Sequence, residues 1–221
     1  MADNQRKSIT VPVILALIVG AGLGYVMHKP ADAKTSGKSD SSSVMSAASN
    51  LRTDLRSGMQ EHAALAAPLL KAALTDSPDL PAAQAAMDKN AVAIADQVNT
   101  VYPGKKNDFL KLWNAHLGYY NDYVAATKAN DEAGKQTAKS NLTDFVNDLA
   151  TLLTKANPKL DKDDLVDHLK MHGDQTLKLI DQLATSDFDK AYTTADAAYA
   201  HMGEVADMLS EKIEAQYPDK F

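Results

Sequence analysis

Residues 109–124 read FLKLWNAHLGYYNDYV. Large aromatic side chains recur here at intervals of three, four and seven positions, which is the spacing of one face of an α-helix. They are Phe109, Trp113, Tyr120 and Tyr123. Tyr102-Pro103-Gly104 precedes the stretch and Asn130-Asp131-Glu132 follows it, and both are typical of places where one helix ends and another begins. The stretch therefore predicts an amphipathic helix within an all-α protein.

The same spacing continues on both sides of this stretch, interrupted by short segments with Pro, Gly, Asn or Asp. It predicts six helices in three αα-hairpins, at about residues 50–104, 105–159 and 160–219. Each hairpin ends in a Pro that follows Tyr or Asn, so the pattern favours threefold duplication of one unit. Because no single hairpin can bury its own apolar stripe, we expect a six-helix bundle or a short helical array.

Local signals place some helix ends more closely. Asn107 and Asp161 are expected to cap the third and fifth helices, because their side chains can accept bonds from free backbone N–H groups. Pro81 suits the first turn of the second helix. Pro68 lies within the first helix and is expected to kink it.

Composition excludes several classes of function. The chain has 221 residues with 45% hydrophobic residues, and its formal net charge is −6 without a dense Lys/Arg cluster, so we expect no nucleic-acid partner. It has no cysteine, which removes thiolate metal sites, thiol nucleophiles and disulfides. We found no nucleophile motif or phosphate loop, and therefore expect a protein that is not an enzyme.

The first residues predict a membrane segment. Arg6 and Lys7 precede an apolar run from Ile9 to Met27, which is about the length that a helix needs to cross a bilayer. Residues 1–29 are thus expected to be a transmembrane anchor that leaves the rest of the chain outside the cytoplasm. The alternative is a signal segment cleaved after Ala33, which would release the protein. Residues 30–49 have almost nothing to bury and predict a disordered tether, followed by a helical domain at 50–221.

Polar residues interrupt the apolar stripes at comparable heights in the three hairpins. In the first helices these are His62, His116 and His172, and in the second helices they are Asn90, Asn141 and His201. Burying such a group without a partner costs about 1–3 kcal/mol. We therefore expect six such groups to bond to one another or to a ligand.

Two interpretations of this His/Asn layer stay open. One is a purely structural layer that fixes helix register. The other is a transition-metal site for copper or zinc with His62, His116, His172 and His201 as ligands. Its auxiliary candidates are His168, Met59, Met87, Asn90 and Asn141, while Met171 and Met202 adjoin two of the histidines. Glu204 is the one carboxylate well spaced from a layer histidine, so a di-iron site is rejected.

Three segments carry a resemblance to a known family: Glu61-His62, residues 109–116, and Ala198–Met202 together with residues 216–221. They resemble a poorly characterised family of secreted or anchored helical proteins of spore-forming Gram-positive bacteria, often labelled "copper amine oxidase". The resemblance covers most of the chain after the tether. It does not imply oxidase chemistry, because copper amine oxidases are β-rich and form their quinone from a Tyr in Asn-Tyr-Asp/Glu-Tyr. Residues 120–123 here have the order Tyr-Asn-Asp-Tyr.

The sequence thus predicts an extracytoplasmic, non-enzymatic helical protein, held at the cell membrane or secreted, whose buried His/Asn layer binds a transition metal such as copper. The alternative is an envelope scaffold or interaction protein in which the same layer only packs. The sequence identifies no protein partner.

Overall fold

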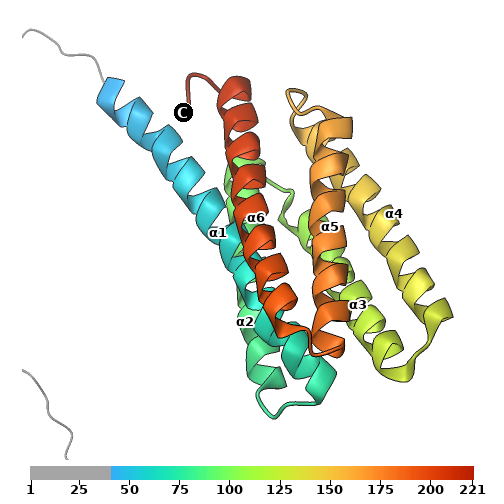
Figure 1. Ribbon diagram of the computed structural model, residues 1–221. Coiled ribbons are helices and arrows are strands. Elements are labelled where there is room, and N and C mark those ends of the chain that lie inside the picture. The colour runs from blue at the N-terminus through green and yellow to red at the C-terminus, as the bar shows by residue number, and fades with distance from the viewer. Residues whose placement is uncertain (1–40) are drawn as a thin grey trace, which may run out of the picture. The chain divides into compact units, whose positions relative to one another are not determined.

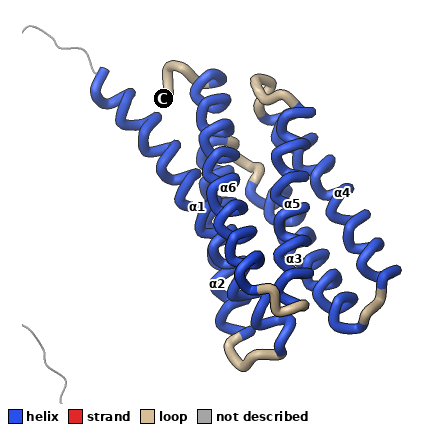
Figure 2. Tube along the Cα trace, viewed as in Figure 1, coloured by secondary structure: helices blue, strands red, loops and turns tan. Residues whose placement is uncertain are grey.

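The computed structural model describes residues 41–221, and this part of the chain is all α-helical, with six helices joined by short loops (Figures 1 and 2). The prediction of an all-α protein is confirmed. The helices are α1 (Ser41–Thr75), α2 (Leu80–Val101), α3 (Lys106–Ala129), α4 (Glu132–Ala156), α5 (Lys162–Ala184) and α6 (Phe188–Gln216).

The predicted membrane segment at residues 1–29 lies outside the described residues. Among helices α1 to α6, none has an apolar stretch long enough to cross a bilayer. α1 begins at Ser41, inside the stretch 30–49 that we expected to be a tether. The first turns of α1 contain Ala and Met, which favour helix, and Ala47 and Ala48 are already half-buried.

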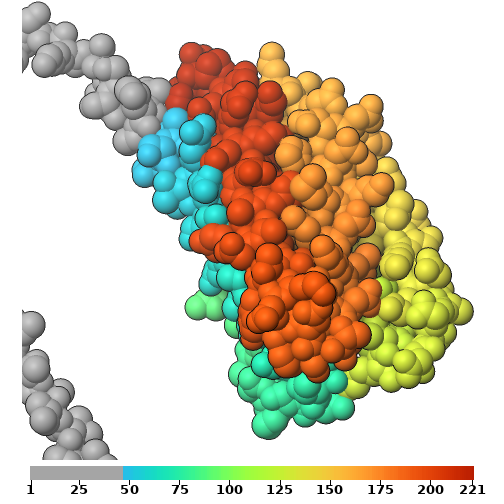
Figure 3. All heavy atoms as spheres, viewed as in Figure 1, coloured from blue at the N-terminus to red at the C-terminus, as the bar shows by residue number. Residues whose placement is uncertain are grey.

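Helices that follow one another in sequence pack together as α1 with α2, α3 with α4, and α5 with α6. α1 also lies against α3, α5 and α6, and its contact with α6 is the most extensive in this part of the chain. In Figure 3, α6 and α5 (red and orange) cover the face toward the viewer, with α1 at one edge and α4 at the other. Duplication of one hairpin stays a prediction.

Gly203 of α6 lies beside two long polar side chains of α1. A Cβ at Gly203 would lie 2.8 Å from Gln60 Nε2 and 3.0 Å from Arg56 Nη2, so any larger residue would push these side chains away. The guanidinium of Arg56 instead reaches across Gly203 and pairs with the carboxylate of Asp207. A larger residue at position 203 would therefore displace the ends of these two flexible side chains and disturb the pair of Arg56 with Asp207.

The core consists of two apolar clusters, one toward each end of the bundle. On α3 the first cluster includes Trp113 and the second includes Tyr120; on α5 they include Leu169 and Leu179. The buried histidines His116 and His172 lie between these positions. A polar level therefore separates the two clusters, as the sequence pattern predicted for these helices.

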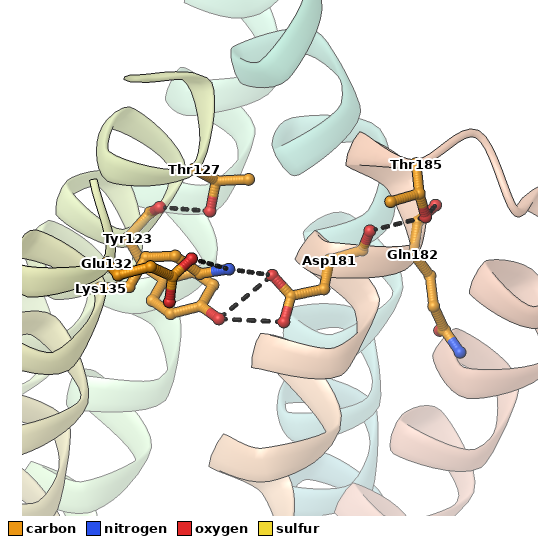
Figure 4. A network of polar contacts seen from close by, with 7 residues as sticks. All are labelled: Tyr123, Thr127, Glu132, Lys135, Asp181, Gln182 and Thr185. Carbon is orange, nitrogen blue, oxygen red and sulfur yellow. Dashed lines mark hydrogen bonds and ion pairs between the residues drawn. The ribbon is translucent and has the colours of Figure 1, made fainter. Parts of the chain in front are cut away.

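A polar network joins α3, α4 and α5 near one end of the bundle (Figure 4). Tyr123 Oη lies 3.0 and 3.1 Å from the two carboxylate oxygens of Asp181 and donates to this group. Lys135 Nζ lies 2.8 Å from Asp181 Oδ1 and also 4.9 Å from the centre of the Tyr123 ring. One carboxylate on α5 thus holds one side chain from each of the other two helices.

Two expected helix starts differ in outcome. Asp161 is the N-cap of α5, as predicted, and its Oδ1 accepts bonds from the N–H groups of Asp163 and Asp164 at 2.9 and 3.0 Å. Asn107 is not the cap of α3, because this helix already begins at Lys106, directly after the turn at Gly104.

Pro81 lies in the first turn of α2, as predicted. Pro68 lies within α1, which continues to Thr75.

Replacing the cap of α5 should destabilise the domain. We expect Asp161→Ala to lower the free energy of unfolding by about 1 kcal/mol, because two backbone N–H groups lose their acceptor. Asp79→Ala is the matched control, since Asp79 is the N-cap residue of α2 but makes no side-chain capping bond. Urea unfolding followed by circular dichroism measures both. An equal loss in the two variants would contradict the capping role of Asp161.

Candidate functional site

Three helices each bring one histidine to the same place in the core. They are His62 on α1, His116 on α3 and His172 on α5, and all three side chains are buried. The ring centre of His62 lies 5.6 Å from that of His116 and 5.7 Å from that of His172. Three of the four predicted metal ligands are therefore brought together.

Aromatic side chains surround these three rings, which we call the histidine cluster. The Trp113 ring lies 4.9 Å from the His62 ring and 4.8 Å from the His116 ring. Phe145 of α4 stacks on His116 with 4.6 Å between ring centres and an interplanar angle of 13°. The cluster thus lies in an apolar, water-poor environment, where charged groups are costly.

This environment keeps the imidazoles neutral. The pKa of His116 is lowered to about 3, chiefly by burial and also by the nearby His172, while the bond to the Trp113 carbonyl opposes both effects. The pKa of His172 is lowered to about 4, chiefly by burial and also by the nearby His201. The pKa of His62 is lowered strongly by burial and by both neighbouring histidines. Neutral imidazole is the form that binds transition metals.

The hydrogen bonding of the cluster is incomplete within residues 41–221. Nδ1 of His116 bonds to the carbonyl oxygen of Trp113, so it carries the proton and the lone pair is on Nε2. Nδ1 of His62 and Nδ1 of His172 are buried and make no hydrogen bond in this part of the chain. Each such atom costs about 1–3 kcal/mol unless something binds it.

Two small cavities adjoin the cluster. The larger, of about 40 Å³, is lined by His116 and His172 together with the thioethers Met59 and Met202. The smaller, of about 20 Å³, is lined by His62, His172 and Met87. Each has room for about one water-sized group.

His201, the fourth predicted ligand, is buried on α6 but has other neighbours. Its ring stacks on His168 with 5.3 Å between the ring centres, and its Nε2 lies 3.0 Å from the backbone oxygen of that residue. Its Nδ1 lies 3.5 Å from Glu204 Oε2. The structure thus places His168 and His201 as a pair of their own beside the cluster.

The two asparagines of the expected layer do not join the histidines. The amide of Asn90 donates to the carbonyl oxygen of Gly58 and to Glu61 Oε2, both at 3.0 Å. Asn141 is half-exposed, contrary to the expectation that it is buried, because it lies at the edge of the stripe formed by Ala138 and Leu142. The level is therefore made mainly of histidines.

The four methionines that the sequence places near the layer residues separate into two groups. Met59, Met87 and Met202 are buried and line the cavities beside the cluster. Met171 is 51% exposed, although it directly precedes His172 in sequence. The helical period explains the difference, since adjacent residues lie about 100° apart around a helix. Sequence reasoning named Met59 and Met87 as auxiliaries and omitted Met202 from that set.

In the described part of the chain, no three His, Asp or Glu side chains are grouped as a bound metal ion would require. The three cluster rings are close, yet they do not form such a group. A metal bound here would need thioether ligands in addition, or a rotation of the rings.

No protein-family model matches this chain, and neither a curated protein nor a solved structure gives a match.

The buried imidazoles should make the fold sensitive to acid. In the unfolded chain they have an ordinary pKa near 6.5, so below that pH the unfolded state binds more protons than the folded state. Stability is therefore full above pH 6.5 and falls as the pH approaches about 4, by up to about 1.4 kcal/mol per pH unit for each histidine.

Urea unfolding at several pH values between about 7 and 5 measures this slope. The slope reports how many more protons the unfolded state binds than the folded state. We expect His116→Gln to lower this number by about one, and the double variant His116→Gln with His172→Gln to lower it by about two. A free energy of unfolding that is constant over this range would contradict the burial of neutral imidazoles.

Proposed function

We propose that this domain binds a transition-metal ion, with copper(I) preferred, through the imidazoles of His62, His116 and His172. One observation carries the proposal: three neutral imidazoles from three helices meet in the core, and two of them have a buried Nδ1 without a bonding partner among the described residues. A metal ion is one group that would satisfy these atoms.

The separations of the rings support this proposal. Two imidazoles bound to one ion through nitrogens at about 2.0–2.1 Å have ring centres about 5–6 Å apart. Two of the three pairs fall in that range, with 5.6 Å between the rings of His62 and His116 and 5.7 Å between those of His62 and His172. Binding would then require the rings to rotate so that their nitrogens face one point, without a change in the helix packing.

The sulfur atoms favour copper(I) over zinc. Met59 and Met202 line the same cavity as His116 and His172. Thioethers are soft ligands, which select copper(I), whereas zinc would use the imidazoles alone. The surrounding Trp113 and Phe145 would exclude water from the ion.

The location and architecture form part of the same proposal. Arg6, Lys7 and the apolar run Ile9–Met27 support an anchor in the cell membrane, with the domain outside the cytoplasm. Cleavage after Ala33 would release the same domain. The pairing of α1 with α2, α3 with α4, and α5 with α6 supports an origin by duplication of one hairpin. A non-enzymatic role in metal handling fits this location.

Copper(I) binding by the full-length chain tests the proposal. The protein would be purified in a mild neutral detergent under reducing, oxygen-free conditions and titrated against a chromogenic copper(I) chelator. We expect one ion per chain, and at least a tenfold higher Kd, about 1.4 kcal/mol, for the triple variant His62→Gln, His116→Gln, His172→Gln. Met59→Leu with Met202→Leu should weaken copper(I) more than zinc.

His168→Gln is the matched control, because this histidine is outside the cluster and its side chain is partly exposed. It should leave the Kd within about twofold. Circular dichroism verifies that each variant is folded. Absence of stoichiometric binding, or equal binding by the triple variant, would refute the metal site.

A second candidate is an envelope scaffold or interaction protein in which the polar level only fixes helix register. The bonds of His116 to the Trp113 carbonyl, of Asn90 to the Gly58 carbonyl, and of His201 to the His168 carbonyl favour it, since each satisfies one side-chain nitrogen within the bundle. In that case added copper or zinc would leave the unfolding midpoint unchanged, whereas a bound ion would raise it.

A further inference from the structure

A surface groove lies between α4 and α5, on the opposite side of α5 from the pair His168 and His201. Its volume is about 780 Å³, within the range of sites for small organic ligands. Apolar side chains from both helices line it, namely Leu142, Val146, Val166 and Leu177. Leu142 and Val146 are buried, and the other two are half-buried.

The charged groups along the groove do not balance. Four lysines and three aspartates line it: Lys139, Lys170, Lys178, Lys190, Asp174, Asp181 and Asp187. Asp181 is held by Lys135 and Tyr123, and Asp187 pairs with Lys190 at 2.6 Å. Among residues 41–221, no carboxylate lies within 4 Å of the ammonium groups of the other three lysines.

Three unpaired cations thus face one unpaired carboxylate, that of Asp174. This local positive excess contrasts with the formal charge of −6 for the whole chain. An anion whose remaining part is apolar would match both the lysines and the floor of the groove.

We propose that this groove binds a long-chain fatty-acid anion, with the acyl chain on the apolar floor and the carboxylate beside Lys139, Lys170 or Lys178. The groove follows α5 from Val166 to Gln182, a length of about 24 Å at 1.5 Å per residue, which accommodates an extended acyl chain. Each buried methylene adds favourable transfer free energy, and a lysine ammonium serves as a point charge for the head group.

An acidic peptide fits the groove less well. Its walls are the two helices α4 and α5, whose backbone N–H and C=O groups are bonded within each helix. An extended peptide would find few partners for its own backbone, and the groove offers side-chain amides only at Asn147 and Gln182 among its lining residues. An acyl chain has no peptide N–H and C=O groups that need hydrogen-bond partners.

Photo-crosslinking of the full-length chain tests this assignment. The protein would be placed in nanodiscs of neutral phosphatidylcholine, exposed to a palmitate analogue that carries a diazirine, irradiated and digested for mass spectrometry. We expect adducts on peptides from α4 and α5 that palmitate suppresses and the uncharged alcohol of the same chain length does not.

Two variants make the test specific. Lys139→Gln, Lys170→Gln and Lys178→Gln together should lower adduct formation by roughly tenfold, because the head group loses its cations. Lys111→Gln, Lys155→Gln and Lys162→Gln remove the same charge from lysines outside the groove and should leave it unchanged. Thr143→Trp fills the groove from an exposed position and should also abolish the adducts.

Adducts confined to other helices, adducts that palmitate does not suppress, or equal loss in the two triple variants would overturn the proposal. Suppression by an acidic peptide and not by palmitate would overturn it in favour of a peptide site. None of these variants alters a proposed metal ligand, so a failure of copper(I) binding and a failure of crosslinking are distinguishable results.

Discussion

The contact of His62 with both His116 and His172 is the constraint on which the arrangement of the bundle depends. It joins α1, α3 and α5 at one level, with an apolar cluster on each side. Moving one helix by a single turn, about 5.4 Å, would bury an imidazole among aliphatic side chains and leave its partners alone. Because the imidazoles stay neutral, burying them at this level sacrifices some hydrogen bonds with water. It avoids the much larger free-energy penalty of a buried charge. The register of the three helices therefore depends on the neutral state of these imidazoles.

Helical spacing was sufficient to predict which residues face the core. It placed Trp113, His116 and Tyr120 on the buried side of one helix, and Asp161 at the start of another. It could not predict which neighbour each polar group contacts. That depends on the rotation of the side chain and on how far around the helix the residue lies from the centre of the apolar stripe. Asn90 therefore bonds to Gly58 and Glu61 across the α1–α2 contact, and Asn141 at the stripe edge stays half-exposed.

The features at the α4–α5 contact had no signal in the sequence. Asp181 and Lys135 resemble ordinary surface charges until the fold places them at 2.8 Å with Tyr123 between the helices. The groove is likewise a property of how closely two helices pack, since residues such as Val146 and Leu177 have the spacing of any core stripe. Local periodicity defines faces, while the distance between two faces is set by every other contact in the bundle.

The surface groove and the cavity beside the histidine cluster share a wall. Leu142, Val146 and Gly173 line both the groove and the cavity that contains His116 and His172. Gly173 directly follows His172, and a Cβ there would meet only the hydroxyl of Tyr120, at 3.7 Å. The wall between the groove and the core is thus thin beside His172, the histidine that lines both small cavities of the cluster. An acyl chain bound in the groove, as proposed, would therefore pack on Leu142 and Val146, the same side chains that line the cavity beside His116 and His172.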